Sequence, residues 1–363
     1  MAKPRILLLV NRWYVDGGVE NFLEQLIAET SGTTDYAICS LITAVDSDAE
    51  CVKLGPVLKA GRVQDMFTQS AAIVAAMREG NYDAVHIQAS NGSAFFLASL
   101  AKKAGIPRRI IHSHNAGAET SANPAKKMVG NACAAIWSGA PTELWACSSN
   151  AGEYLFGKRD FKVFYNGIDL GKFAFSQEKR DSVRRELGVG GDVFLLGSIG
   201  RISLQKNPLF QLRVFAELVK LVPNARFCMV GRGDLETERD AEIEKLGIGD
   251  KVLIVPRTSQ SDAFYSAFDA LLFPPVFEGL SFVGIESQCS GVPMYASTAV
   301  PSELDVTDRI TYMSLEEALP DWAERIASGI EKFPLAERGS YAEKMRAAGF
   351  DRAACFENIA NAY

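Results

Sequence analysis

The chain has 363 residues, of which 48% are hydrophobic and 23% are charged, and its formal net charge is −6 at pH 7. This length is too great for one ordinary core and suits two domains of roughly 150–200 residues each. The composition excludes a disordered protein, and the negative net charge argues against nucleic-acid binding as the main function.

The cysteines and the apolar runs bear on location. Seven scattered cysteines form no C-x-x-C pair, which favours reduced thiols in a cytosolic protein. The apolar start at residues 5–10 is too short for a signal peptide, and no run approaches about 18 apolar residues. We therefore expect a cytoplasmic chain that does not cross a membrane.

The first half alternates short apolar runs with helical patterns. The apolar runs are typical of buried strands and cover residues 5–10, 36–42, 82–88, 108–114 and 143–149. Strands that alternate with helices predict a parallel sheet with helices on both faces.

The second half restarts this pattern. Its strands are expected at residues 193–200, 225–231, 251–256, 270–274 and 293–297. Asn207 and Pro208 predict the N-cap and first residue of a helix. The turn-rich stretch 165–173 indicates the boundary between an N-terminal domain over 1–168 and a C-terminal domain over 169–344. A helix over about residues 345–363 is expected to pack back on the first domain.

Ligands of such sheets bind outside the carboxyl ends of the strands. After the first strand of the second half, "GSIGRISLQKNP" places Arg201 and Lys206 beside a helix N-terminus, which suits a diphosphate. Two solvated surface cations are an equally good interpretation. In "VPRTSQ" Arg257 follows a later strand whose main chain suits a flat base. Neither G-x-G-x-x-G nor a Walker A motif occurs, which argues against NAD enzymes and P-loop NTPases.

Two carboxylates stand out in "VFEGLSFVGIESQCSGVP". Glu278 lies in a loop before a short helix that Ser281 is expected to cap, and Glu286 lies in its second turn. Gly291 and Pro293 are expected to end the helix. A carboxylate only accepts hydrogen bonds and suits vicinal hydroxyls. The alternative is one glutamate favoured by the helix dipole and one that is solvated.

The same loop offers backbone donors. Gly279 permits close approach of a ligand to the main chain, and the amides of Leu280 and Ser281 are candidate donors.

Together these motifs resemble one family. "FEGLSFVGIESQCSGVP" resembles the Glu–seven residues–Glu motif of retaining glycosyltransferases of the GT-B fold, glycosyltransferase family four. "GRISLQKNP" is similar to its Arg/Lys diphosphate loop, "YNGID" to its interdomain segment, and "GGVE" (17–20) to its N-terminal glycine loop. The resemblance implies two facing Rossmann-like domains with a cleft between them. The domain over 1–168 would bind the acceptor, and the domain over 169–344 would bind the nucleotide sugar.

The resemblance also implies roles for the second half. Arg201 and Lys206 would bind the donor diphosphate and stabilise the leaving group. Glu278 would contact the transferred sugar, with the amides of residues 279–281 near sugar or phosphate. Glu286 would bind the nucleotide ribose. The resemblance implies no metal. It implies no cofactor either, because the nucleotide sugar is a substrate.

In the first half, Gly17 and Gly18 would let the N-terminal loop approach the donor phosphate. The family has a histidine near the reacting centre after an N-domain strand, and "RRIIHSHN" offers two. We favour His114, with His112 and Asn115 on the acceptor side. The sequence leaves open which of the two histidines is nearer, and His86 is interpreted as structural.

The family's retaining outcome implies attack from the side of the leaving group, whose phosphate oxygen takes the acceptor's proton. Three alternatives remain. "DSD" (46–48) resembles a metal-binding triplet of another glycosyltransferase class. The other two are a nucleotide-sugar epimerase or hydrolase on this fold, and a silent partner subunit that binds nucleotide sugar.

Basic pairs flank an apolar stretch at residues 128–140, and their surface is either an ordinary solvated face or a contact with an anionic membrane. The pairs are Lys102/Lys103, Arg108/Arg109 and Lys126/Lys127. "TELWACSSNAGEYLFG" resembles bacterial enzymes that build capsular polysaccharide or exopolysaccharide on a lipid carrier. We therefore expect a uridine diphosphate (UDP) sugar as donor and a lipid-linked sugar as acceptor, at the inner face of the membrane.

Overall fold

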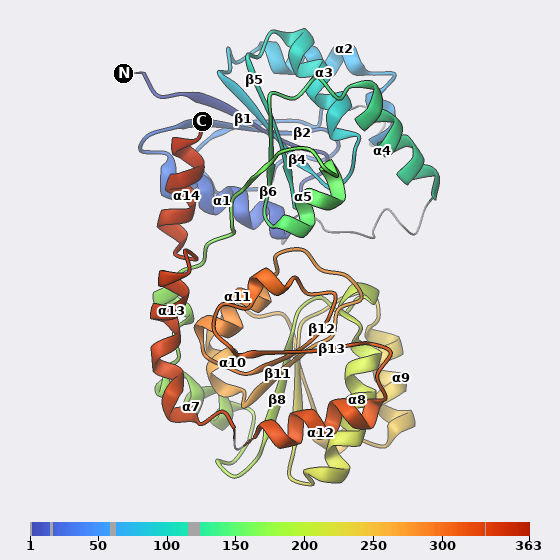
Figure 1. The fold of residues 1–363 in the computed structure, drawn as a ribbon, viewed down its shortest axis with the longest axis vertical. Coiled ribbons are helices and arrows are strands. Elements are labelled where there is room, and N and C mark those ends of the chain that lie inside the picture. The colour runs from blue at the N-terminus through green and yellow to red at the C-terminus, as the bar shows by residue number, and fades with distance from the viewer. Residues whose placement is uncertain (1, 15–16, 59–62, 115–123, 331) are drawn as a thin grey trace. The chain divides into compact units, whose positions relative to one another are not determined.

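The computed structural model describes residues 2–14, 17–58, 63–114, 124–330 and 332–363. The chain divides into two compact units, Met1–Gly167 with Arg352–Tyr363 and Ile168–Asp351 (Figure 1). The boundary at Gly167 lies one residue before the end expected for the N-terminal domain.

The first unit is built on one parallel sheet with the strand order β3-β2-β1-β4-β5-β6-β7. Its strands are β1 (Arg5–Val10), β2 (Asp35–Ser40), β3 (Val52–Leu54), β4 (Ala84–Ala89), β5 (Arg108–Ser113), β6 (Glu143–Ala146) and β7 (Lys162–Val163). Its α-helices are α1 (Gly18–Thr30), α2 (Ser70–Arg78), α3 (Ala94–Ala104), α4 (Pro124–Ile136), α5 (Ser149–Phe156) and α14 (Arg352–Asn361).

Alternation along β1 explains how this sheet is covered on both faces. Successive side chains of a strand point to opposite faces. Ile6 and Leu8 join a core that includes Phe22 of α1 and Phe356 of α14, while Leu7 between them is equally buried. The continuous apolar run "RILLLV" is therefore the signature of a strand buried on both faces.

The second unit is built on a six-stranded parallel sheet with the order β10-β9-β8-β11-β12-β13. Its strands are β8 (Leu195–Ile199), β9 (Arg226–Val230), β10 (Val252–Val255), β11 (Ala270–Phe273), β12 (Met294–Ser297) and β13 (Ile310–Met313). Its α-helices are α6 (Leu170–Phe173), α7 (Gln177–Glu186), α8 (Pro208–Leu221), α9 (Glu236–Leu246), α10 (Ser261–Ala267), α11 (Phe282–Cys289), α12 (Leu319–Gly329) and α13 (Tyr341–Ala347).

One face of this sheet packs against α8 and α12. Phe215 of α8 and Trp322 of α12 are fully buried there with Leu272 of β11. Pro208 is the first residue of α8, as predicted, and Asn207 occupies the N-cap position, although no side-chain hydrogen bond caps the helix.

Short 3-10 helices connect several of these elements. They are η1 (Val63–Met66), η2 (Leu204–Lys206), η3 (Gly249–Lys251), η4 (Ser302–Leu304) and η5 (Leu335–Ser340).

Both sheets confirm the predicted pair of doubly wound α/β halves, and they share one strand order. In each, the first strand of the unit lies between the second and the fourth. The chain therefore leaves β1 or β8 toward one side of the sheet and later returns on the other. Ligands of open α/β sheets bind at this switch point, outside the carboxyl ends of the strands.

The C-terminal region corrects one expectation. The segment that belongs to the first unit begins at Arg352 and not near residue 345. The reason is α13, which packs against α11 and α6 and so belongs to the second unit.

Candidate functional site

The two strands at the switch point of the second unit carry an ion pair at their carboxyl ends. Lys206 follows β8 and Glu278 follows β11, and β8 and β11 are hydrogen-bonded neighbours. Lys206 Nζ donates to Glu278 Oε2 over 2.5 Å, and the side chains are 18% and 10% exposed. The sequence predicted both residues for donor binding, and the structure brings them into direct contact.

Contacts between the two loops hold this pair in place. The Val276 amide donates to the Gln205 carbonyl (2.9 Å), and the Gln205 side-chain amide donates to the Phe277 carbonyl (3.3 Å). Lys206 Nζ also lies 4.6 Å from the ring centroid of Phe273, the last residue of β11. A cation over an aromatic face and beside a carboxylate is fixed before any ligand arrives.

Glycines shape the turn that carries Arg201. Gly200 and Gly231 have φ angles of +147° and +145°, which side chains rarely adopt. A Cβ at Gly231 would lie 2.0 Å from the Gly200 carbonyl oxygen. The turns after β8 and β9 are thus pressed together, and Arg201 is exposed beside them. The Gly-Arg-Gly turn of residues 231–233 packs against the Arg201 loop, since a Cβ at Gly233 would lie 2.3 Å from the Ile202 carbonyl oxygen.

The amino end of α11 presents backbone amides beside the ion pair. Ser281 occupies its N-cap position, as predicted, but makes no side-chain capping bond. Gly279 and Leu280 are buried before it. Within the described part of the chain, the amides of residues 279–281 donate no hydrogen bond. They remain available to an acceptor, as the amino end of a helix favours.

Glu286 lies in the second turn of α11, as predicted, and Gly291 follows the helix with φ +65°. Tyr265 of α10 donates a hydrogen bond from its hydroxyl to Glu286 Oε2 over 2.8 Å. Burial raises the pKa of Glu286 to about 7, against the lowering effects of the Tyr265 hydrogen bond and of Lys172. The sequence gave no signal for Tyr265, because a contact between two helices is set by the fold.

Arg257 follows β10, two strands away from β8 in the sheet. Its side chain is exposed. A role for Arg257 in donor binding stays a prediction.

The first unit holds its three histidines together. His86 Nε2 lies 3.0 Å from His112 Nδ1, and the rings of His112 and His114 are 4.2 Å apart between centroids. His86 Nδ1 lies 2.6 Å from the hydroxyl of Tyr363. His86 and His112 are fully buried. Burial lowers the pKa of His86 and His112 well below the ordinary value and that of His114 to about 3, so all three are neutral at pH 7.

A glutamine fixes the protonation of His114. The Gln88 side-chain amide donates to the His86 carbonyl (3.3 Å), which directs Gln88 Oε1 at His114 Nε2 (2.6 Å). An amide oxygen can only accept, so Nε2 of His114 carries the proton and Nδ1 is left as an acceptor. Among the described residues, His112 Nε2 is buried without a hydrogen-bond partner.

The predicted glycine loop of the first unit precedes α1. Gly17 is its N-cap, and Glu20 reaches back to accept a hydrogen bond from the Tyr14 amide (3.2 Å). A Cβ at Gly17 would collide with the Glu20 carboxylate, whereas Gly18 faces open space. Asn115, predicted on the acceptor side, lies outside the described residues.

The predicted basic patch is smaller than expected. Arg108 pairs with Glu143 (2.5 Å), and Arg109 donates to the carbonyls of Ala140, Ile106 and Pro107. These two guanidinium groups bond to protein atoms around the start of β5 and are only partly exposed. Lys102, Lys103 and Lys127 are exposed, while the side chain of Lys126 is outside the described part of the chain.

Within the ranges that the structure describes, no three or more His, Cys, Asp or Glu side chains gather in a way that would hold a metal ion. No helix within the same ranges has both the length and the apolar character to cross a membrane. In the "DSD" segment, the carbonyl of Asp46 accepts a hydrogen bond from the indole of Trp13 (2.7 Å).

The chain resembles known proteins in sequence and in fold. Residues 179–333 match the family model described as glycosyl transferases group 1. The chain is 29% identical to putative glycosyltransferase EpsF of Bacillus subtilis (strain 168) over 254 residues, which cover 68% of the chain and 66% of EpsF. It is 26% identical to UDP-Gal:alpha-D-GlcNAc-diphosphoundecaprenol alpha-1,3-galactosyltransferase of Escherichia coli, over 61% of the chain and 59% of that relative. The chain thus spans 66% and 59% of the length of these two relatives, less than two thirds of each.

Solved structures share the fold. HepE of Anabaena, in complex with UDP-glucose, superposes with a TM-score of 0.77 and 18% identity, over 99% of this chain and 98% of HepE. WaaG, a glycosyltransferase involved in lipopolysaccharide biosynthesis, gives a TM-score of 0.74 and 16% identity, over 98% and 99% of the two chains. The two Rossmann-like units therefore match the GT-B structures that these glycosyltransferases represent.

Proposed function

We propose that this chain, whose residues 179–333 match the glycosyl transferases group 1 family, is a retaining glycosyltransferase of family four. It transfers a sugar from a nucleotide-diphosphate sugar to a sugar acceptor. The observation that carries the proposal is the Lys206–Glu278 ion pair at the switch point of the second sheet. This pair lies within the matched residues and at the place where such sheets bind ligands.

The charges of the second unit suit the chemistry. Breaking a sugar–phosphate bond leaves negative charge on the diphosphate, and preorganised cations and amides stabilise such charge most effectively. Lys206, Arg201 and the amides at the start of α11 supply this stabilisation in the proposal. Glu278 contacts the hydroxyls of the transferred sugar, and Glu286 binds the ribose.

The proposed reaction proceeds without metal. The departing phosphate oxygen takes the acceptor's proton as the acceptor attacks from the same side. Glu278 and Glu286 do not act as a glycosidase pair in this proposal, since a retaining pair needs two carboxyl groups about 5 Å apart across one bond. Glu278 lies in the loop before α11, and Glu286 lies in the second turn of that helix. His114, with an unprotonated Nδ1, is the residue of the first unit that we assign to the reaction.

The donor and acceptor classes follow from the relatives. HepE was solved with UDP-glucose, and the name of the Escherichia coli relative contains a UDP-sugar donor and a diphosphoundecaprenol acceptor. These names support a UDP-sugar donor and a lipid-linked acceptor in exopolysaccharide or capsule synthesis. A cytoplasmic enzyme that touches the inner face of the membrane would reach such an acceptor, and Lys102, Lys103 and Lys127 are the exposed cations proposed for that contact.

Product analysis tests the proposal against its rivals. The purified chain is incubated with UDP-sugars, with and without a lipid-linked sugar and in the presence of EDTA. The proposal expects a glycosylated lipid with retained anomeric configuration, formed only with acceptor and unaffected by EDTA. Epimerised or hydrolysed sugar without acceptor would support the rival enzymes, and no turnover of any donor would support a silent binding subunit.

Glu278→Ala supplies the matching variant. Loss of the sugar contact is expected to lower turnover by roughly 100- to 1000-fold, whereas Glu217→Ala, which breaks an exposed Lys–Glu pair on α8, leaves turnover unchanged. Near-normal turnover of Glu278→Ala contradicts the assignment of that residue.

A further inference from the structure

Glu286 has two carboxylate oxygens in different surroundings. Oε2 accepts the hydrogen bond from the Tyr265 hydroxyl over 2.8 Å. Within the described residues Oε1 accepts no hydrogen bond. Tyr265 is fully buried, while Glu286 is only partly buried. The carboxylate is therefore held from the protein side, and one oxygen is left for a ligand.

We propose that Tyr265 is a positioning residue for ribose recognition, which holds Oε2 of Glu286 so that Oε1 faces the ribose hydroxyls. This inference rests on the proposed function, since it needs a nucleotide at Glu286. Tyr265 acts through Glu286 and does not itself touch the donor.

Arg338 links α10, which carries Tyr265, to α11, which carries Glu286. Its guanidinium donates to the Tyr265 carbonyl (2.6 Å) at the end of α10. It also donates to the carbonyl (2.9 Å) and the hydroxyl (2.7 Å) of Ser290, the C-cap of α11. One buried side chain thus ties the helix of Tyr265 to the helix of Glu286. These hydrogen bonds all go to protein atoms, so the role of Arg338 is structural.

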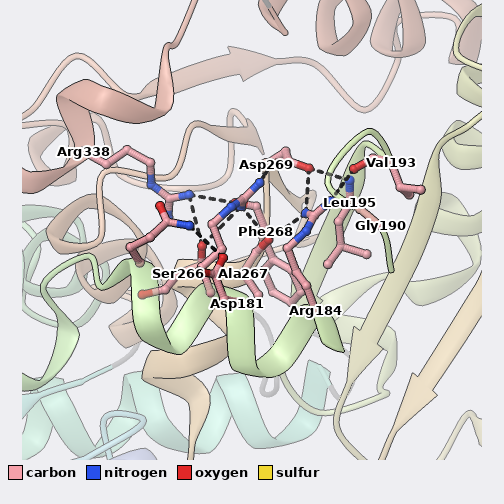
Figure 2. A network of polar contacts seen from close by, with 12 residues as sticks. Asp181, Arg184, Gly190, Val193, Leu195, Ser266, Ala267, Phe268, Asp269 and Arg338 are labelled. Carbon is pink, nitrogen blue, oxygen red and sulfur yellow. Dashed lines mark hydrogen bonds and ion pairs between the residues drawn. The ribbon is translucent and has the colours of Figure 1, made fainter. Parts of the chain in front are cut away.

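The surroundings of Arg338 explain why it stays in place. Figure 2 shows Arg338 and Arg184 converging on the segment Ser266–Asp269. Arg180 of α7 donates to the Ala267 carbonyl (2.7 Å) and pairs with Asp269 (2.5 Å). Cations at the carboxyl end of a helix are favoured by the helix dipole. The end of α10 that carries Tyr265 is therefore immobilised by several charge-assisted hydrogen bonds.

The charged groups around Glu286 predict how the pair responds to pH. Tyr265 and Asp262 face it from α10, Lys172 from α6 and Cys289 from its own helix, and Arg346 of α13 acts on Cys289. Burial raises the pKa of Glu286 to about 7, while the Tyr265 hydrogen bond lowers it. Removing the hydroxyl should raise this pKa further, so that less of the carboxylate is ionised at neutral pH.

The experiment compares a nucleoside diphosphate with its analogue that lacks both ribose hydroxyls. Calorimetry gives the affinity of the full chain for UDP, GDP and ADP, and the tightest ligand is then compared with its 2′,3′-dideoxy form between about pH 6 and pH 9. The diphosphate is common to both ligands, so the ratio of affinities reports the ribose contact alone. In the wild type this ratio should fall as the pH falls through about 7.

Four variants decide the outcome. Tyr265→Phe should lower the ratio about tenfold at pH 7, the effect of a lost hydrogen bond to a charged group, and should move its midpoint to higher pH. Tyr295→Phe is the matched control and should leave the ratio unchanged. Tyr295 is also buried, and its hydroxyl makes only a 3.5 Å contact with the Ile326 carbonyl. Glu286→Gln should lower the ratio, and Tyr265→Phe should add nothing in that background.

Two results overturn the inference. One is a Tyr265→Phe variant with the ratio and pH midpoint of the wild type, and the other is full additivity with Glu286→Gln. If Tyr265→Phe fails to fold, Glu286→Asp is measured, since it keeps the charge but withdraws it from the hydroxyl. A wild-type ratio in Glu286→Asp would then contradict the inference. A wild type that binds none of the three nucleotides overturns the proposed function itself.

Discussion

The two units share a strand order but differ in the charge at their carboxyl edges. The second unit presents an ion pair, Lys206 with Glu278, after the two central strands. The first unit presents neutral histidines at the end of β5, with His114 held by Gln88. One sheet topology therefore carries two different sets of polar side chains. A charged edge suits a diphosphate, and a neutral edge suits hydrogen bonds to hydroxyl groups.

The buried titratable groups of the two units also have pKa values shifted in opposite directions. Burial of the histidines in the first unit opposes protonation and so lowers their pKa values. Burial of Glu286 in the second unit opposes ionisation and so raises its pKa. Both are desolvation effects, and only the charge of the ionised form differs. Four measurements test this difference between the units.

The largest effect is expected from Lys206→Ala. The variant removes a cation from the proposed diphosphate site and leaves Glu278 without its partner, so turnover should fall by about 1000-fold. Steady-state kinetics with the donor identified by product analysis checks this. Lys220→Ala is the control, because Lys220 pairs with Glu217 on the exposed face of α8. Equal activities of the two variants would mean that the charged edge is not the site.

The pH dependence of stability should differ in sign between the units. Below pH 6.5 the unfolded histidines bind protons that the native first unit does not, so its stability should fall by about 1.4 kcal/mol per pH unit for each histidine. For Glu286 the native state binds the extra proton between pH 4.5 and about 7, so its contribution to stability is lost as the pH rises through that range. The loss is at most about 3 kcal/mol.

Hydrogen exchange followed by mass spectrometry, corrected for intrinsic exchange rates, resolves the two units of the intact chain. The peptides of β4 and β5 should lose protection in acid. The peptides of α11 should lose protection with rising pH, and Glu286→Gln should remove that trend. Parallel responses in both units would contradict the assigned protonation states.

Gly231→Ala tests the glycine contact that supports Arg201. The new Cβ would lie 2.0 Å from the Gly200 carbonyl oxygen at a φ of +145°. The free energy of unfolding should fall by about 2 kcal/mol, and the affinity for nucleotide should fall as well. Gly191→Ala, where a Cβ meets nothing within 4 Å, should change stability by less than about 0.5 kcal/mol. Chemical denaturation measures both, and a neutral Gly231→Ala variant would contradict the contact.

The smallest effect concerns Gln88. The chain has three histidines, so nitrogen-15 NMR spectra should show three pairs of imidazole nitrogen signals. In the wild type one of them should be a neutral ring protonated at Nε2, assigned to His114 by its loss in His114→Phe. Gln88→Leu should release this tautomer and lower turnover several-fold, and Gln25→Leu, on the exposed face of α1, should do neither. A wild-type His114 protonated at Nδ1 would contradict the hydrogen bond.

Much of the fold could be predicted from local patterns. The apolar runs of β1, β8, β9 and β11 are buried on both faces, and so they are visible as continuous hydrophobic segments. The edge strands β3 and β13 were missed, because they are short and two or more of their side chains are only partly buried or exposed. The return point at Arg352 was missed because the choice of partner for α13 depends on packing between helices.

Part of the candidate site could be predicted from the sequence, namely the charged residues that follow predicted strands. Lys206, Glu278 and Glu286 were predicted because polar residues stand out at the ends of apolar runs. Tyr265 lies 21 positions before Glu286, and only the folded arrangement of α10 and α11 brings them together. Gln88 was missed for a similar reason, since its partner His114 directly follows the neighbouring strand β5.

We propose that the second unit holds a nucleotide diphosphate at the Lys206–Glu278 edge. The most direct test is a thermal-shift screen of the full chain against nucleoside diphosphates and their sugars, run in parallel on the wild type, Lys206→Ala and Lys220→Ala. A ligand bound by the native state raises its melting temperature. We predict that one nucleotide family raises the Tm of the wild type and of Lys220→Ala and leaves that of Lys206→Ala unchanged. An equal shift in all three proteins, or no shift with any nucleotide, would contradict the claim.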